Sequence, residues 1–235
     1  MLFRTFRSLC LLPVLAGSAA IPVGTASAGG TVALPLESGG AFSVPVTSMK
    51  DLKFRTTIHQ QYDFSCGSAA LATLLTHHYG FPVSEQEVFR EMYTRGDQAK
   101  IKKEGFSLLD IKSFLANRGF QADGFVADVE QLSKAGVPAI ALIKERGYNH
   151  FVVIKGLRQG RILIGDPSSG TRALPFDQFR NMWLNRILFV IRNRKELARF
   201  DSEGDWRWVP TAPVADGLHR PTTDLALPKR GPSDF

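Results

Sequence analysis

Cysteine is scarce in this 235-residue chain, which contains only Cys10 and Cys66. Two cysteines cannot build the multiple disulfides of a small secreted scaffold. A content of 44% hydrophobic residues, with 17 phenylalanines, can bury a core without such staples. Runs of Lys and Arg are also missing, although the formal net charge is +7. Because nucleic-acid-binding surfaces gather their basic residues, we expect no nucleic-acid partner and a single globular domain.

The first 28 residues have the pattern of a secretory signal peptide. Arg4 and Arg7 give a positive start, residues 9–20 are mostly apolar, and residues 26–28 form an Ala-Ser-Ala cleavage site. An uncleaved anchor is the alternative, but the apolar stretch is shorter than the about 20 residues that a membrane-spanning helix needs. We therefore expect cleavage, a periplasmic location and no integral membrane span in the mature chain.

The rest of the chain divides into three parts. Residues 29–56 contain short apolar stretches broken by Gly and Pro, which indicates an extended N-terminal arm rather than a helix. Residues 57–200 carry the helix and strand patterns of one domain. Residues 201–235 are rich in Pro, Gly, Asp and Thr, which is typical of a loosely ordered tail. Trp206 and Trp208 can still dock on the domain, and we assign the tail no catalytic role.

Helix signals come first in the domain and strand signals follow. Ser65 is placed to cap the first helix and Gly80 to end it, and the second and third helices open with Ser-x-x-acid capping boxes. The expected helices begin at Cys66, Ser84 and Ser107, with a shorter piece after Asp128. Four runs rich in Val and Ile predict antiparallel strands at 137–143, 151–157, 161–165 and 186–191. This order indicates an α+β fold.

Removal of the signal peptide leaves Cys66 as a lone cysteine in an oxidising compartment. Such a residue is most often a small buried hydrophobe, and the alternative is a reactive thiol. At the first turn of a helix the thiol lies near the positive end of the helix dipole, which with a nearby imidazolium can lower its pKa to roughly 3.5–7.5. Gly67 would let a substrate backbone approach. Gln60 could place its amide beside the Cys66 backbone N–H as a second oxyanion donor, with Gln61 as its competitor.

His150 and Asp166 are the candidates for a base and its orienting carboxylate. His150 opens one predicted strand and Asp166 ends the next, so antiparallel pairing would place them side by side. A surface histidine and an ordinary Asp-Pro turn are the alternative interpretations. His59 is a second candidate base, but no strand pairing supplies it with a carboxylate. The adjacent His77 and His78 point roughly 100° apart on a helix and lack a further spaced ligand, so we expect no metal site and no cofactor.

Three short motifs contain these residues: 60–67 (Gln-Gln-Tyr-Asp-Phe-Ser-Cys-Gly), 149–154 (Asn-His-Phe-Val-Val-Ile) and 164–167 (Ile-Gly-Asp-Pro). Together they resemble the catalytic motifs of the C39 peptidases, which are papain-like cysteine proteases, and the resemblance spans residues 57–192. It implies a papain-like α+β fold, in which a helical N-terminal half carries the nucleophile at a helix N-terminus and packs on an antiparallel β-sheet. The implied roles are Cys66 as nucleophile, His150 as general base and acid, Asp166 as orienting group and Gln60 as oxyanion donor.

Ser65 departs from the family pattern, because members commonly carry Asp directly before the cysteine. Ser65 can still cap the helix, so the departure concerns local substrate recognition. The chain has no phosphate-binding GxxxxGKS/T loop, and it therefore resembles the stand-alone exported branch of the family rather than members fused to transporters. That branch includes peptidases of bacterial functional-amyloid secretion systems.

The expected function is therefore an exported cysteine endopeptidase that cleaves a secreted protein or peptide after a Gly-Gly type site. A secreted amyloid subunit or another secretion component is the partner that the resemblance implies. Two alternatives stay open. One is a catalytically silent peptide-binding module or secretion chaperone, and the other is a papain-like cell-wall amidase.

Overall fold

A computed structural model describes residues 29–35 and 41–209 of the chain. The predicted signal peptide, and the predicted tail beyond residue 209, lie outside the described residues. The chain falls into two units. The first contains an antiparallel hairpin of β1 (Gly29–Pro35) and β2 (Ala41–Thr47). The second begins at Ser48 and opens with a short helix, α1 (Met49–Lys53), which was not expected in this stretch and which the Ser48 side chain caps.

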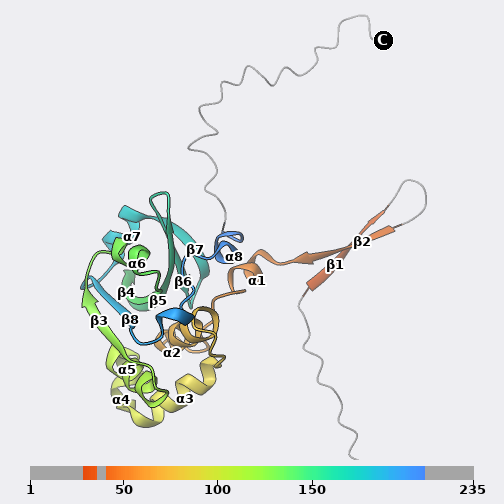
Figure 1. Ribbon diagram of the computed structural model, residues 1–235. Coiled ribbons are helices and arrows are strands. Elements are labelled where there is room, and N and C mark those ends of the chain that lie inside the picture. The colour runs from red at the N-terminus through yellow and green to blue at the C-terminus, as the bar shows by residue number, and fades with distance from the viewer. Residues whose placement is uncertain (1–28, 36–40, 210–235) are drawn as a thin grey trace, which may run out of the picture. The chain divides into compact units, whose positions relative to one another are not determined.

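The second unit is built on a six-stranded antiparallel sheet with the strand order β3-β8-β4-β5-β6-β7 (Figure 1). Its strands are β3 (Ala122–Val126), β4 (Ala139–Glu145), β5 (Tyr148–Arg158), β6 (Arg161–Asp166), β7 (Gly170–Pro175) and β8 (Ile187–Ile191). Gly147 and Gly160 have positive φ and close the two hairpins on either side of β5. These hairpins bring the start of β5 beside the end of β6. The four predicted strands correspond to β4, β5, β6 and β8.

Helices cover both faces of this sheet. One face carries α2 (Cys66–Thr73), its continuation as a π-helix (Leu74–His78), α3 (Glu85–Arg95), α4 (Gln98–Glu104) and α5 (Leu108–Asn117). The other face carries α6 (Glu130–Ala135) and α7 (Phe176–Met182). A 3-10 turn (Lys195–Leu197) and α8 (Glu203–Trp206) follow the last strand. The predicted α+β fold, with a helical N-terminal half on an antiparallel sheet, is confirmed.

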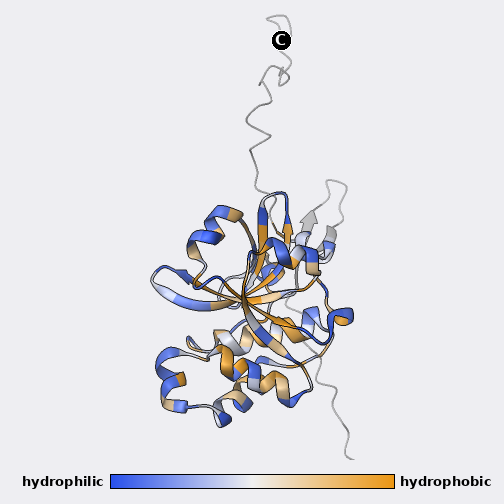
Figure 2. Ribbon diagram, turned by 60° about the vertical axis from the view of Figure 1, so that its left-hand side comes forward, coloured by the Kyte–Doolittle hydropathy of each residue, from blue (hydrophilic) through white to orange (hydrophobic). Residues whose placement is uncertain are grey.

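Strand β5 contributes to a hydrophobic core on each face of the sheet. Phe151 and Val153 pack with the α2–α5 layer, whereas Val152 and Ile154 pack with α6 and α7. Figure 2 shows hydrophobic residues concentrated along the central strands. Because successive strand residues face opposite sides, coverage on both faces explains the unbroken apolar run in this strand.

Helix α2 is buried along its whole length. Its small residues, from Gly67 to Ala72, let it pack closely on the sheet, and the helical segment stops at Gly80, whose φ is 65°. Ser65 occupies the N-cap position, but its hydroxyl bonds the backbone N–H and carbonyl of Tyr62 at 3.1 and 3.0 Å. The predicted side-chain cap is therefore wrong, because Ser65 closes the preceding loop instead.

The other two predicted helix starts are present. Ser107 and Asp110 form the predicted capping box of α5. Ser84 caps α3 through the Glu87 backbone N–H, but the Glu87 side chain pairs with Arg118 and does not complete a box.

The segment 201–209 is docked on the domain, and it includes Trp206, one of the two tryptophans expected to dock within an otherwise loose tail. The ammonium of the buried Lys155 lies 2.6 Å from the Asp205 carboxylate, and the Trp206 indole donates to Asp201 at 2.7 Å. Gly156 lies against this segment, because a Cβ there would come within 2.5 Å of Asp201 Oδ1. The ion pair of Asp205 could not be predicted from composition, because its partner is a single lysine within an apolar strand.

Candidate active site

Cys66 is the first residue of α2, and its side chain is buried. Burial raises the pKa of the thiol, while hydrogen bonds from the backbone N–H groups of Phe151 and Gly67 oppose the rise and the charge of Asp166 adds to it. This direction is opposite to the lowered pKa expected at a helix start, because desolvation of the thiolate outweighs the backbone hydrogen bonds that favour it. The thiol needs a base before it can act as a nucleophile.

Gly67 makes room for an aromatic side chain next to the cysteine. A Cβ at this position would lie 2.9 Å from Phe106 Cβ and 3.4 Å from Phe151 Cδ2. The space that the sequence suggested for a substrate backbone is therefore filled by Phe106. Phe106 and Phe151 together form walls beside Cys66.

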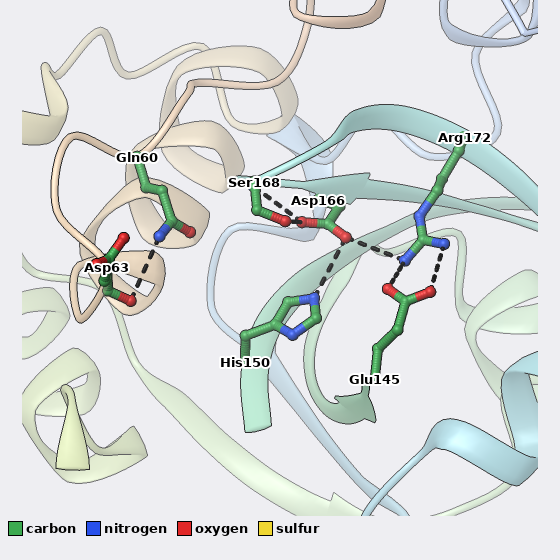
Figure 3. Close-up of polar contacts among 7 residues, drawn as sticks. All are labelled: Gln60, Asp63, Glu145, His150, Asp166, Ser168 and Arg172. Atoms are coloured by element: carbon green, nitrogen blue, oxygen red, sulfur yellow. Dashed lines mark hydrogen bonds and ion pairs between the residues drawn. The ribbon is translucent and has the colours of Figure 1, made fainter. Parts of the chain in front are cut away.

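The register of β5 and β6 brings His150 and Asp166 together. Val153 pairs with Gly165 in these antiparallel strands, so the start of β5 and the end of β6 lie at one edge of the sheet. His150 Nε2 lies 3.2 Å from Asp166 Oδ2 (Figure 3). The predicted proximity of these two side chains is confirmed, while their catalytic roles stay a prediction. With Nε2 facing the carboxylate, Nδ1 is the ring nitrogen left for a thiol.

Asp166 is buried, and both of its carboxylate oxygens have partners. Oδ1 accepts from the backbone N–H and the hydroxyl of Ser168 at 2.9 and 2.7 Å, and Oδ2 accepts from Arg172 at 3.0 Å in addition to His150. Burial alone would raise the pKa of Asp166, but the hydrogen bonds from His150 and Ser168 outweigh it and hold the pKa well below its ordinary value. Asp166 is therefore anionic at neutral pH.

Arg172 and Glu145 extend this network. The Arg172 guanidinium donates to both Glu145 carboxylate oxygens at 3.1 and 2.6 Å (Figure 3). Sequence reasoning missed both residues, because β4 and β7 are separated in the sheet by β5 and β6 and the strand order is not readable from the sequence. Ser168 was also missed, although a serine two residues after Asp is a signal for an Asx turn.

Glu145, His150 and Asp166 have the spacing of a possible cation site. One ligand atom from each lies within 4.8 Å of the others. Arg172 bonds both carboxylates, however, so its positive charge already occupies the position that a cation would take. The arrangement is therefore better described as an ion-pair network than as a metal centre.

The two candidate oxyanion donors point in different directions. The Gln60 backbone N–H donates to Pro167 O at 3.1 Å, and the Gln60 side-chain amide donates to loop carbonyls, including that of Asp63 at 3.4 Å (Figure 3). Gln61 Oε1 accepts from Gln86 on α3 at 3.2 Å. The geometry favours Gln60 over Gln61, while its role as an oxyanion donor stays a prediction.

The other histidines make contacts outside this network. The His59 ring packs on Phe54 with a centroid distance of 4.6 Å. His78 is buried, and its Nδ1 donates to the Arg199 carbonyl at 2.6 Å. Burial lowers the pKa of His78 to about 4, so this ring is neutral near pH 7.

Two cavities meet at the site. An apolar cavity of about 720 Å³ is lined by Cys66, Phe106 and Phe151, among others. A more polar cavity of about 550 Å³ is lined by residues that include Gln60 and His150. Asn149 borders both cavities. An extended peptide that crosses the site at Asn149 would therefore pass from an apolar to a polar environment.

A buried cysteine at a helix start, beside two paired strands that present a bonded histidine and aspartate, is the architecture of a papain-like thiol hydrolase. Residues 55–195 match the model of the Peptidase C39 family. The chain therefore belongs to the peptidase C39 family and is a cysteine peptidase.

Named relatives agree with this assignment. The chain is 36% identical over 156 residues to the probable functional amyloid protease FapD of Pseudomonas aeruginosa, covering 66% of this chain and 69% of the relative. It is 36% identical over 185 residues to the probable functional amyloid protease FapD of Pseudomonas fluorescens, covering 78% of each. A solved double glycine motif protease from an AMS/PCAT transporter, in complex with the leader peptide, is 26% identical with a TM-score of 0.47, covering 57% of this chain and 89% of that one.

Within residues 29–35 and 41–209, no helix has both the length and the apolar character needed to cross a membrane.

Proposed function

We propose that this protein is an exported periplasmic cysteine endopeptidase that cleaves a secreted protein substrate. The observation that carries the proposal is the position of Cys66 at the start of α2, in one cavity with Phe151, the residue that follows His150, whose ring is bonded to Asp166. The signal-peptide pattern of residues 1–28 supports export. The names of the two FapD relatives support a secreted amyloid subunit, or another component of its secretion system, as the substrate.

The first half of the reaction forms an acyl-enzyme. His150 accepts the thiol proton at Nδ1, and the Cys66 thiolate attacks the carbonyl carbon of the scissile bond. Asp166 stabilises the resulting imidazolium through Nε2. The Gln60 amide leaves its loop carbonyls and donates, with the Cys66 backbone N–H, to the oxyanion. His150 then protonates the leaving amine, the C–N bond breaks, and a thioester remains.

The second half of the reaction returns the free enzyme. His150 accepts a proton from water, and the hydroxide attacks the thioester carbonyl. The C–S bond breaks, Cys66 leaves as thiolate, and the imidazolium returns the proton to it. The products are a new carboxyl terminus, a new amino terminus and the original thiol–imidazole pair.

We assign the two cavities to the two sides of the scissile bond from the proposed role of His150. His150 protonates the leaving amine, so the polar cavity that it lines takes the residues after the cleaved bond. The apolar cavity beside Cys66 takes the residues before it. Leu108 and Leu142 line this apolar cavity and suit apolar substrate residues.

A Gly-Gly type site fits the apolar cavity where it meets the nucleophile. Phe106 and Phe151 line the cavity beside Cys66, and Phe106 fills the space next to Gly67. We propose that these rings restrict the approach to the thiol, so that glycine, which lacks a Cβ, is favoured on the acyl side of the cleaved bond. We therefore place the cleaved bond after a pair of glycines.

The test uses two peptides that share an apolar segment and differ only in Gly-Gly against Ala-Ala. Mass spectrometry should locate a single cut after Gly-Gly and none in the second peptide. Cys66→Ala and His150→Ala should abolish cleavage, while His59→Ala serves as a matched histidine control. Persistent cleavage by Cys66→Ala would overturn the mechanism. Tight binding without turnover by the wild type would favour a peptide-binding module, and release of cell-wall peptides instead would favour an amidase.

The natural substrate can be identified in cells. Exported proteins that accumulate uncleaved in a Cys66→Ala strain, and that carry a new amino terminus after Gly-Gly in the wild type, are the expected substrates. An exported protein pool that is identical in the two strains would contradict the proposed role.

A further inference from the structure

We propose that Arg172 and Glu145 form a charged brace that positions Asp166 and sets the pH range over which His150 exchanges protons. The inference rests on the proposed function, because it concerns the same histidine and aspartate. Neither brace residue touches the reacting atoms in the mechanism above. Both act through Asp166 and are therefore positioning residues.

The brace is held by directional contacts. The terminal nitrogens of Arg172 make two bonds to Glu145, of 3.1 and 2.6 Å, and a third bond of 3.0 Å to Asp166 Oδ2. Arg172 Nε is buried without a hydrogen-bond partner, so the two carboxylates alone fix the plane of the guanidinium. The Asp166 oxygen that receives Arg172 is also the one that faces His150 Nε2. Arg172 therefore acts on the oxygen that orients the imidazole.

The brace spans the active-site edge of the sheet. Glu145 is the last residue of β4 and Arg172 lies on β7, so their contact bridges over β5 and β6, which carry His150 and Asp166. Figure 3 shows the guanidinium between the two carboxylates, with the imidazole on the other side of Asp166. A link across two intervening strands has no evident use in sheet pairing, because each strand already bonds its own neighbours.

The charges of the brace are sheltered from water. The side chains of Arg172 and Glu145 are 23% and 27% exposed, and that of Asp166 is 1% exposed. Salt and water therefore screen these charges less than they screen a surface pair. Arg172 partly neutralises Asp166, and Glu145 partly neutralises Arg172. Removal of the Arg172 charge makes the surroundings of the imidazole more negative by one unit. Removal of the Glu145 charge makes them more positive by one unit.

Charged and titratable groups surround His150 from several elements. Asp166 from β6 and Glu145 from β4 lie close to it, and Arg172 from β7 is bonded to both. Asp63 from the loop before α2, with Arg146 and Tyr148 from the β4–β5 hairpin, lines the same cavity as His150, and Cys66 from α2 faces the imidazole in the proposed mechanism. Among these described groups, Glu145 and Arg172 are the pair linked to the orienting carboxylate. We therefore expect substitutions in that pair to shift the pH profile of peptide cleavage.

The two single substitutions have opposite expected effects on the pH dependence of kcat/KM. Arg172→Met leaves two uncompensated carboxylates near the imidazole, which favours the imidazolium and moves the acid limb to higher pH, because the neutral imidazole is the form that accepts the thiol proton. Glu145→Gln leaves the guanidinium uncompensated, which disfavours the imidazolium and moves that limb to lower pH. Each shift should be about half to one pH unit, given partly screened charges a few ångströms away.

A conservative variant separates charge from positioning. Arg172→Lys keeps the positive charge but loses the bidentate fork, so its acid limb should stay near that of the wild type. Its kcat should fall about tenfold, because Asp166 is held less firmly. Arg118→Met is the matched control, since Arg118 pairs with Glu87 and Glu91 on α3, and it should shift neither limb.

The experiment measures pH profiles of peptide cleavage by the full chain and, in parallel, the pH dependence of Cys66 alkylation by iodoacetamide. Circular dichroism and thermal melts establish that each variant is folded. Opposite shifts for the two single variants support the brace. Loss of kcat without shifts, or shifts of the same sign, would overturn it. If the wild type cleaves no peptide, the proposed function fails, while the alkylation profiles still test the brace.

Discussion

The ammonium of Lys155 lies 2.6 Å from Asp205 Oδ1, and both side chains are buried. Lys155 stands on β5, the strand that presents His150, and it also donates to the carbonyl and hydroxyl oxygens of Thr56 at 2.8 and 2.6 Å. This contact joins β5 to the segment that precedes α2 and to the segment that follows residue 200. The segment 201–209 is therefore part of the folded domain.

Asp205→Ala should destabilise the protein by about 3–5 kcal/mol, because it leaves a buried ammonium without its counter-ion. Denaturant unfolding followed by circular dichroism measures the loss. Replacement of both partners, Lys155→Met with Asp205→Leu, should recover most of it, since no buried charge remains. Glu203→Gln is the control, because Glu203 is 87% exposed and pairs at the surface with Arg158. Equal stability of Asp205→Ala and the wild type would contradict the role of the pair.

Acid should weaken the fold through His78. Burial lowers the pKa of His78 to about 4 from its ordinary value of 6.5. Between these values the unfolded chain binds a proton that the folded chain does not, so the free energy of unfolding falls as the pH drops through this window. The loss should be on the order of 2–3 kcal/mol. Unfolding curves above and below the window measure it, and a His78→Gln variant should show a flatter dependence. An unchanged slope in that variant would rule out His78 as the source.

Gly67→Ala should lower kcat/KM strongly while changing the free energy of unfolding only slightly. The new Cβ would lie 2.9 Å from Phe106 Cβ, so Phe106 must move within the cavity that also holds Cys66. We expect a loss of about tenfold or more in kcat/KM, because small misplacements next to a nucleophile are costly. A second substitution, Phe106→Ala, should restore space and widen acceptance from Gly-Gly to Ala-Ala peptides. Peptide cleavage assays and thermal melts on the two variants test this, and wild-type kinetics in Gly67→Ala would refute it.

Asp166→Asn should reduce kcat by about a hundredfold or more with little change in KM. An amide cannot stabilise the imidazolium as a carboxylate does, and it can hold the ring in the wrong tautomer. Ser168→Ala should cost about tenfold or less, since it removes one donor while the backbone N–H of residue 168 still bonds Oδ1. Steady-state kinetics separates kcat from KM. A rise in KM of the same size with kcat unchanged in Asp166→Asn would show that Asp166 contributes to binding rather than to proton transfer.

Local signals predicted much of the fold. Val- and Ile-rich runs located β4, β5, β6 and β8, and the Ser107–Asp110 pattern located α5, because each depends on residues close in sequence. Strands β3 and β7 were missed. Exposed residues interrupt β3, and β7 follows a turn directly and carries Arg172 within its short span. Neither has the apolar alternation that marks a strand.

The site was predictable where it depended on adjacent strands. His150 and Asp166 belong to consecutive antiparallel strands, so sequence order alone placed them together. Glu145 and Arg172 meet across two intervening strands, and their contact depends on strand order and on a sheet edge that no local pattern encodes. The sign of the Cys66 pKa shift was wrong for a related reason. It is decided by the burial of the thiol, which depends on residues that are far from Cys66 in sequence.

The hydrogen bond from the Gln60 backbone N–H to Pro167 O connects the two halves of the site. Gln60 belongs to the segment leading into α2, and Pro167 directly follows Asp166. Thr56, which lies only four positions before Gln60, is bonded to both Lys155 and Asp205. Loss or displacement of the segment 201–209 should therefore lower turnover as well as stability, because Thr56, which this segment holds, lies close in sequence to Gln60, the proposed oxyanion donor.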